Sequence, residues 1–167
     1  MRKYITVFFI ALGFILASSA ANAFDYQDWI PLLPESIGGL DKQGEPEGMN
    51  MEKSGQSMST LKQEYSDGSG NDARLTIVTG TNAPGVREFK TLQKFNMETG
   101  ERKVKTLEIS GYKAVLDFNK KGGRSNLMIA PQEKILVVIE TRSFDTEDAL
   151  ISMGNDVPLA ELADSVE

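Results

Sequence analysis

The order of the predicted secondary-structure elements constrains the fold of this chain more than any other feature of its sequence. Short stretches in which apolar and polar residues alternate follow one another, separated by turn residues such as Ser110-Gly111. Alternation with a period of two is typical of strands, and glycine-containing breaks between them indicate hairpins. The predicted strands are 57–65, 73–80, 101–109, 112–119, 125–130 and 135–142.

Two helices complete the predicted framework. Pro84 suits the first turn of a helix, and apolar residues follow it at helical spacing until Gly100. A second helix is predicted over 146–153, where Asp145 can cap the free N–H groups of the first turn. Because this order has no βαβ repetition, we expect an antiparallel sheet of about six strands with two helices packed on it, a single α+β domain.

The first 23 residues have the features of an export signal. Two basic residues precede an apolar run at 5–17, and the segment ends in the small-residue motif Ala21-Asn22-Ala23. The apolar run is shorter than the roughly 17 to 25 residues that cross a bilayer. We therefore predict a signal peptide at 1–23 that is cleaved between Ala23 and Phe24, which gives a periplasmic or secreted protein without a transmembrane segment.

The chain that remains after cleavage, 24–167, is predicted to be one folding unit. An irregular N-terminal segment at 24–55, interrupted by prolines and glycines, precedes the α+β domain at 56–167. Since the chain has no cysteine, hydrophobic burial rather than disulfide bonding must stabilise it.

Two absences restrict the chemistry. The chain has neither cysteine nor histidine, which excludes thiol nucleophiles, Ser-His-Asp triads and metal sites built from these residues. Carboxylate catalysis remains open, because a glycosidase needs only two acids at about 5 to 10 Å. Nothing in the sequence singles out Glu35, Asp117 or Glu140, and an ordinary ion pair is the favoured interpretation of the last two. We expect no catalytic residue and no cofactor.

The charge of the chain is unevenly distributed. Without Arg2 and Lys3, 16 bases and 24 acids remain, a net charge of −8 that argues against nucleic acid as a partner. The segment 102–124 is nevertheless basic. If strand pairing gathers its bases, they form a surface for an acidic protein or an anionic envelope component; alternatively, they only discourage edge-to-edge pairing of strands. The proposed partner-binding residues are Lys103, Lys105, Lys120, Lys121 and Arg124.

Three methionines offer a second possibility. Met49 and Met51 are two residues apart and would share one face of a strand, while Met58 lies at the start of the first predicted hairpin. Thioether sulfur is a soft ligand that favours Cu(I). The favoured alternative is that these flexible apolar side chains fill gaps beneath a loop.

Several short motifs carry a resemblance. Leu33-Pro34-Glu-Ser-Ile-Gly38-Gly-Leu40 is followed by Gly44-Glu-Pro46-Glu-Gly48, a methionine-bearing hairpin and a Ser-Gly-Tyr turn. In these motifs the chain resembles a group of small exported bacterial proteins, and its element order is similar to the layered PsbP/Mog1-like fold. The resemblance implies no catalytic residue.

These observations lead to one functional hypothesis and two alternatives. The hypothesis is an exported, non-catalytic binding or interaction module. The first alternative is a periplasmic protein that handles Cu(I) through methionine thioethers, and the second is a carboxylate-based hydrolase.

Overall fold

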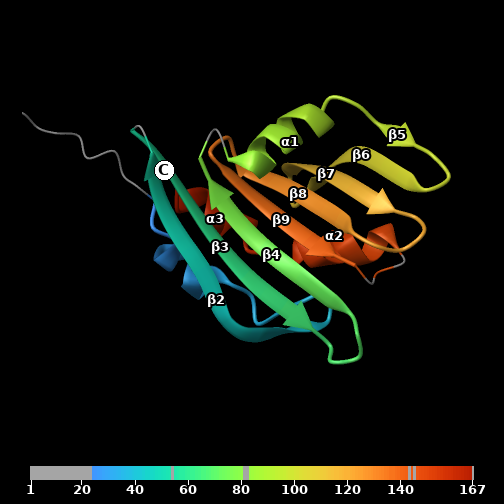
Figure 1. Cartoon of the computed structure of the whole chain (residues 1–167), viewed down its shortest axis with the longest axis horizontal. Coiled ribbons are helices and arrows are strands. Elements are labelled where there is room, and N and C mark those ends of the chain that lie inside the picture. The colour runs from blue at the N-terminus through green and yellow to red at the C-terminus, as the bar shows by residue number, and fades with distance from the viewer. Residues whose placement is uncertain (1–23, 54, 81–82, 143, 145, 167) are drawn as a thin grey trace, which may run out of the picture.

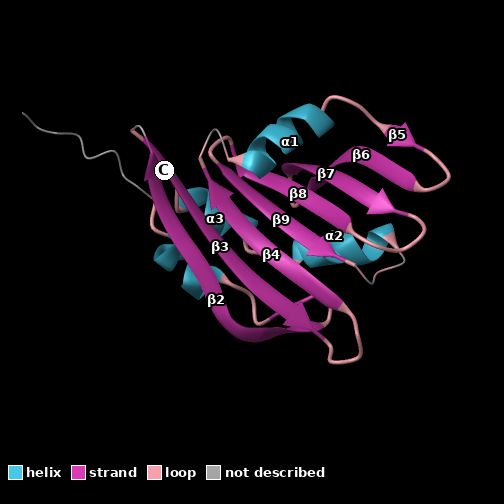
Figure 2. Cartoon of the chain, in the orientation of Figure 1, coloured by secondary structure: helices cyan, strands magenta, loops and turns pink. Residues whose placement is uncertain are grey.

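The described residues of the computed structural model form one nine-stranded antiparallel sheet (Figures 1 and 2). The structure describes 24–53, 55–80, 83–142, 144 and 146–166, so the predicted signal peptide lies outside the described residues. The strand order is β1-β2-β3-β4-β9-β8-β7-β6-β5. The strands are β1 (Ser36–Ile37), β2 (Leu40–Lys53), β3 (Gln56–Ser66), β4 (Asp72–Thr79), β5 (Met97–Glu98), β6 (Arg102–Ile109), β7 (Tyr112–Asn119), β8 (Ser125–Gln132) and β9 (Ile135–Thr141).

The sheet consists of two meanders joined along their inner strands. β1 to β4 follow in chain order from one edge, and β5 to β9 follow in chain order from the other. The two meet where β4 pairs with β9, in continuous register from Ala73 opposite Thr141 to Thr79 opposite Ile135. β9 therefore lies in the middle of the sheet. Its residues 135–139 are all apolar, which suits a strand that is covered on both faces.

The predicted α+β class with a six-stranded sheet is wrong, because strands dominate the structure and the fold is closer to all-β. The largest difference is β2, a strand of 14 residues within the segment that the sequence predicts to be irregular. β1 pairs only with Leu40 and Asp41 of β2, so the rest of this long strand forms the edge of the sheet. Gly44, Pro46 and Gly48 are tolerated there, because an edge strand has no second neighbour to hydrogen-bond. A register shift between Gln43 and Glu47 accommodates the proline.

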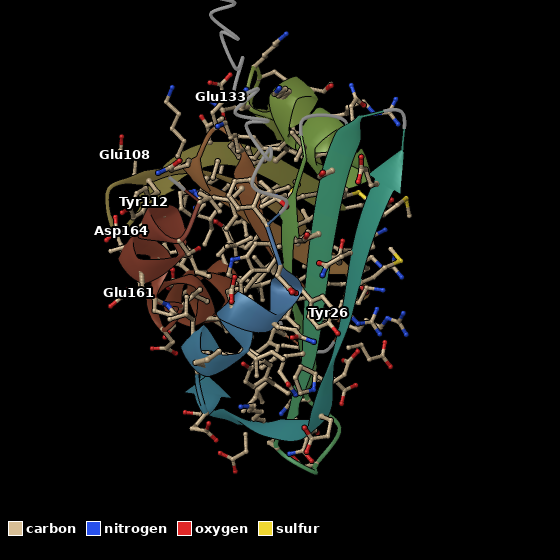
Figure 3. The ribbon with its side chains drawn as sticks, turned by 90° about the vertical axis from the view of Figure 1, so that its left-hand side faces the viewer. Tyr26, Glu108, Tyr112, Glu133, Glu161 and Asp164 are labelled. Carbon is tan, nitrogen blue, oxygen red and sulfur yellow. The ribbon has the colours of Figure 1, made fainter. Side chains whose placement is uncertain are left out.

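The ring of Tyr26 explains one of the β2 glycines. An added Cβ at Gly48 would lie only 1.9 Å from the Tyr26 ring. Tyr26 extends from the N-terminal 3-10 helix η1 (Tyr26–Leu32) toward the β2–β3 ribbon (Figure 3). The sequence predicts that Gly48 interrupts a strand, but in the structure this glycine allows the ring of Tyr26 to lie directly against the backbone of β2.

Three helices pack on one face of the sheet. η1, α2 (Glu147–Asn155) and α3 (Leu159–Asp164) contact this face, and α2 and α3 lie behind the sheet in the view of Figure 1. Trp29 of η1 is buried, and its indole N–H donates to Ser165 Oγ at 3.1 Å, which ties the two ends of the described chain together. The main core lies here, with side chains such as Leu61, Leu75, Ile139, Leu150 and Leu162.

Among the described helices, only α1 (Pro84–Leu92) lies on the opposite face. Val86 and Phe89 of this helix pack on Val115, Met128 and Leu136 to form a smaller second core. The helix ends at Leu92, well before the predicted stop at Gly100, because residues 97–98 pair with β6 as strand β5. Much of this face of the sheet therefore has no helix over it.

The packing of α2 gives the first testable prediction. A Cβ added at Gly154 would lie 2.7 Å from Leu127 Cδ2 and 3.2 Å from Ile129 Cδ1. Both of these side chains are fully buried in the core. Gly154→Val should therefore lower the free energy of unfolding by about 1–3 kcal/mol through overpacking. The control is Gly100→Val, where an added Cβ meets nothing within 4 Å. Equal denaturation midpoints for the two variants would contradict the predicted packing.

Candidate functional site

A row of polar side chains crosses the face of the sheet that carries α1. Glu64, Arg74, Glu140, Asn126 and Asp117 are successive register partners on β3, β4, β9, β8 and β7. Directly paired residues in an antiparallel sheet point to the same side, so these five side chains lie side by side. Polar residues near the ends of five neighbouring strands thus form one continuous feature of the surface.

A groove of about 720 Å³ lies over one half of this row. Gly85 and Glu88 of α1 form one wall, and the β7–β8 turn with Lys121 and Arg124 forms another. The remaining lining residues are Glu101, Arg102, Asp117, Asn119, Gly122, Asn126, Met128, Val138 and Glu140. The groove is therefore polar at its sides, with a small apolar area beside the helix.

The Arg102–Asp117 ion pair is the most constrained contact in the groove. The guanidinium of Arg102 makes two hydrogen bonds to the Asp117 carboxylate, one of them from Nε to Oδ1 at 2.6 Å. The hydrogen bond to Asp117 raises the pKa of Arg102, which keeps the guanidinium charged. The side chain of Asp117 is only 10% exposed, whereas that of Arg102 is 50% exposed.

A second ion pair repeats this arrangement. Arg124 Nε lies 3.4 Å from Glu140 Oε1, and Arg142 lies 4.0 Å from the same oxygen. The side chain of Glu140 is 22% exposed and that of Arg124 is 58% exposed. In both pairs the acid lies near the sheet and the arginine lies toward solvent, so the charge that a ligand would meet first is a guanidinium.

The structure separates the five predicted partner-binding residues into two groups. Lys120, Lys121 and Arg124 lie in and beside the β7–β8 turn and pair with Glu98, Glu101 and Glu140, respectively. Lys103 and Lys105 point to the other face of the sheet, because Val104 between them lies opposite Asp117 of the groove. Every one of the five is ion-paired, and only Lys121 and Arg124 line the groove.

The two lysines of β6 share one carboxylate. Lys103 Nζ lies 2.8 Å from Glu147 Oε1, and Lys105 Nζ lies 2.6 Å from Oε2. Partial burial disfavours the charged form of Glu147, but hydrogen bonds from both lysines outweigh this effect and lower its pKa. The start of α2 thus supplies one counter-charge for both lysines on the helical side of the sheet.

The three candidate carboxylates do not form an acid and base pair. Asp117 and Glu140 both line the groove, but arginines occupy their oxygens, whereas a glycosidase requires a protonated general acid. Glu35 does not line the groove and lies 3.3 Å from Lys42 Nζ. The ion-pair interpretation of Asp117 and Glu140 is confirmed, because Asp117 pairs with Arg102 and Glu140 pairs with Arg124.

The candidate methionine ligands share one face of the β2–β3 hairpin. Met51 is the direct register partner of Met58, and Met49 is paired with Thr60 on the same side. Within the described residues, no group of three or more acidic, histidine or cysteine side chains could hold a metal ion. A cation site in this part of the chain would therefore depend on a different type of ligand.

No sequence motif predicts the groove. Asn126, Arg102 and Glu88 come from three separate segments and form no spaced pattern. The available signal was the position of Asp117 and Asn126 within otherwise apolar strands, because a polar side chain at such a position needs a partner. That signal indicates an ion pair or hydrogen bond but does not identify the partner.

Comparison with other proteins adds no assignment. No protein-family model matches the chain, and neither the curated proteins nor the solved structures give a match. The resemblance to small exported bacterial proteins and to the PsbP/Mog1-like fold therefore stays a prediction. Among the described helices, none has both the length and the apolar composition needed to span a membrane.

The Arg102–Asp117 pair gives a second prediction. Arg102→Gln removes the counter-charge of a buried carboxylate and should lower the free energy of unfolding by about 1–3 kcal/mol. The control is Arg87→Gln, an exposed arginine of α1 outside the groove. Adding Asp117→Asn to Arg102→Gln should recover part of the loss, because the unpaired charge is then gone. Additive losses in the double variant would contradict a direct interaction.

Glu147 gives a third prediction, on pH dependence. Its pKa in the folded state lies below the ordinary value of 4.5, so its ion pairs stabilise the protein at neutral pH. This stabilisation should amount to about 1 kcal/mol, because the pairs are partly exposed. It should disappear as the pH falls below 4.5 and through the folded pKa.

Urea denaturation of the wild type and Glu147→Gln at several pH values measures this effect. The difference between the two proteins should be largest at neutral pH and vanish in acid. Glu133→Gln, in the exposed turn before β9, provides the control. A difference that did not change with pH would show that Glu147 acts through packing rather than charge.

Proposed function

We propose that this chain is an exported, non-catalytic interaction module that binds an acidic segment of a protein partner in the groove beside α1. The single observation that carries the proposal is the unequal burial within the two groove ion pairs. The carboxylates of Asp117 and Glu140 are largely covered, while Arg102 and Arg124 are half-exposed or more. A carboxylate on a partner can therefore contact these guanidiniums without displacing the buried acids.

Arginine suits this role for a physical reason. A guanidinium has five N–H donors, and a carboxylate that occupies two of them leaves others free for a second acceptor. The buried carboxylate of Asp117 holds Arg102 by two hydrogen bonds, so that less side-chain entropy is lost when a ligand binds to this arginine. The ion pairs thus prepare the groove for an anionic group rather than neutralise it.

The mixed charge of the rim favours a protein over a uniformly anionic polymer. Glu88 and Glu101 lie in the same groove as Lys121 and Arg124. A glycan or lipid surface with only negative charges would be repelled by the two acids, whereas a protein segment can present basic groups to them and acidic groups to the arginines. Met128 and Val138 add a small apolar contact area.

We propose a function without catalysis because of the residue types that the chain contains. Glu140 and Asp117 are held by arginines, and the chain contains no histidine or cysteine that could act as a base or nucleophile. Export rests on the sequence of residues 1–23 alone.

Binding of defined peptides tests the proposal. A short peptide of alternating Glu and Ser, a matched peptide of Lys and Ser, and polygalacturonate would each be titrated into isotope-labelled protein. The Glu peptide should shift the NMR signals of Asn126 and the Arg124 side chain. Arg124→Gln should weaken its binding by about tenfold, the value of one charge-assisted hydrogen bond.

The outcomes separate the parts of the proposal. Arg87→Gln, which changes an exposed arginine outside the groove, should leave binding unchanged. Equal or tighter binding of polygalacturonate would overturn the assignment of a protein partner. If the Glu peptide left the groove signals unchanged, the groove would not be the binding surface.

A further inference from the structure

We propose that Met49, Met51 and Met58 form a thioether site for Cu(I) on the β2–β3 hairpin, independent of the groove beside α1. The inference begins with the strand register. Met51 lies directly opposite Met58, and Met49 follows on the same side opposite Thr60. Cβ atoms of directly paired residues are about 4.5–5.5 Å apart, so the flexible methionine side chains can bring their sulfur atoms to one ion.

The exposure of these side chains argues against a packing role. Methionines that fill gaps in a core are buried, but Met49 is 48% exposed and Met51 is 42% exposed. They belong to a group of four exposed large apolar side chains among the described residues, and the other two are Ile30 and Phe95. The gap-filling interpretation favoured by the sequence therefore does not hold for the two β2 methionines.

Met58 fixes the inner side of the proposed site. Its side chain is partly buried against the second core, and the backbone of Gly80 lies close to it. One thioether is thus held against the sheet surface while the two on β2 remain free to move. Figure 3 shows sulfur atoms on the side of the β2–β3 ribbon that faces away from η1.

The chemistry of the donors selects the ion. Thioethers are soft, uncharged ligands that favour Cu(I) over hard cations such as Mg²⁺ and Ca²⁺, which require oxygen ligands. Thioethers carry no proton at neutral pH, so binding of Cu(I) releases none. The chain has no thiol or imidazole that could compete for the ion. Three thioethers on a hairpin would therefore give a site for the reduced ion, without any redox step in the protein.

Titration with Cu(I) tests the inference directly. Under anaerobic conditions, the purified protein should bind one Cu(I) ion, supplied as its weak acetonitrile complex, with a dissociation constant below about 1 µM. Replacement of all three methionines by leucine keeps the apolar volume and should weaken binding by at least about a hundredfold. Met97→Leu, a partly buried methionine of β5, is the matched control and should bind as the wild type does.

A second measurement locates the ion. Ag(I), a soft monovalent ion that does not change oxidation state, should shift the ¹³C-methyl NMR signals of Met49, Met51 and Met58 and leave that of Met97 unchanged. Mg²⁺ should shift none of them. Wild-type affinity in the triple leucine variant, failure of the wild type to bind one Cu(I) ion at micromolar concentration, or shifts confined to other methionines would each overturn the proposal.

Arg124→Gln separates this site from the groove. The substitution should leave Cu(I) binding unchanged, because Arg124 lies on the β7–β8 turn and the methionines lie on β2 and β3. Loss of Cu(I) binding in this variant would contradict the independence of the two sites.

Discussion

The pairing of β4 with β9 is the interaction on which the rest of this structure depends. It joins residues 73–79 to 135–141, across more than fifty intervening residues, and unites two meanders into one sheet. Closing so long a loop costs conformational entropy, and burial of Leu75, Ile77, Val137 and Ile139 at the junction offsets that cost. Without this pairing neither meander has a complete core, because both helical layers contact strands on the two sides of the junction.

Unequal coverage of the two faces follows from the position of the helices in the chain. η1, α2 and α3 come from the two ends of the described chain and meet on one face, where Trp29 and Ser165 join them. α1 is the connection between the meanders, and a single helix of nine residues cannot cover a sheet of nine strands. The part of this face that α1 does not cover holds both the groove beside α1 and the methionines of the β2–β3 hairpin. Its charges are arranged in pairs because a carboxylate against the sheet needs a counter-ion.

Prediction from the sequence succeeded where local pattern decides structure. The hairpins around Ser110-Gly111 and at 66–72 are present, as is the α2 helix, whose cap is Thr146 rather than the expected Asp145. It failed at β2, because Gly44 and Pro46 are strand breakers only where both strand edges must pair. It also failed to place the basic residues on one surface, because Lys103 and Lys105 face an acid from a helix more than forty residues away. The sequence shows that Met49 and Met51 share one face of a strand, but it does not show that Met51 is paired with Met58.

The sequence by itself determined the residue types available to this protein, its succession of strands and turns, and the absence of imidazole and thiol chemistry, because each depends on identity or on near neighbours along the chain. Only the tertiary structure decided which strands are central, which acid pairs with which base, and which polar groups share a groove. These depend on contacts between residues far apart in sequence, and many pairings are compatible with one alternating pattern. Packing against the helices selects one of them, and the same packing leaves much of the other face of the sheet without a helix over it.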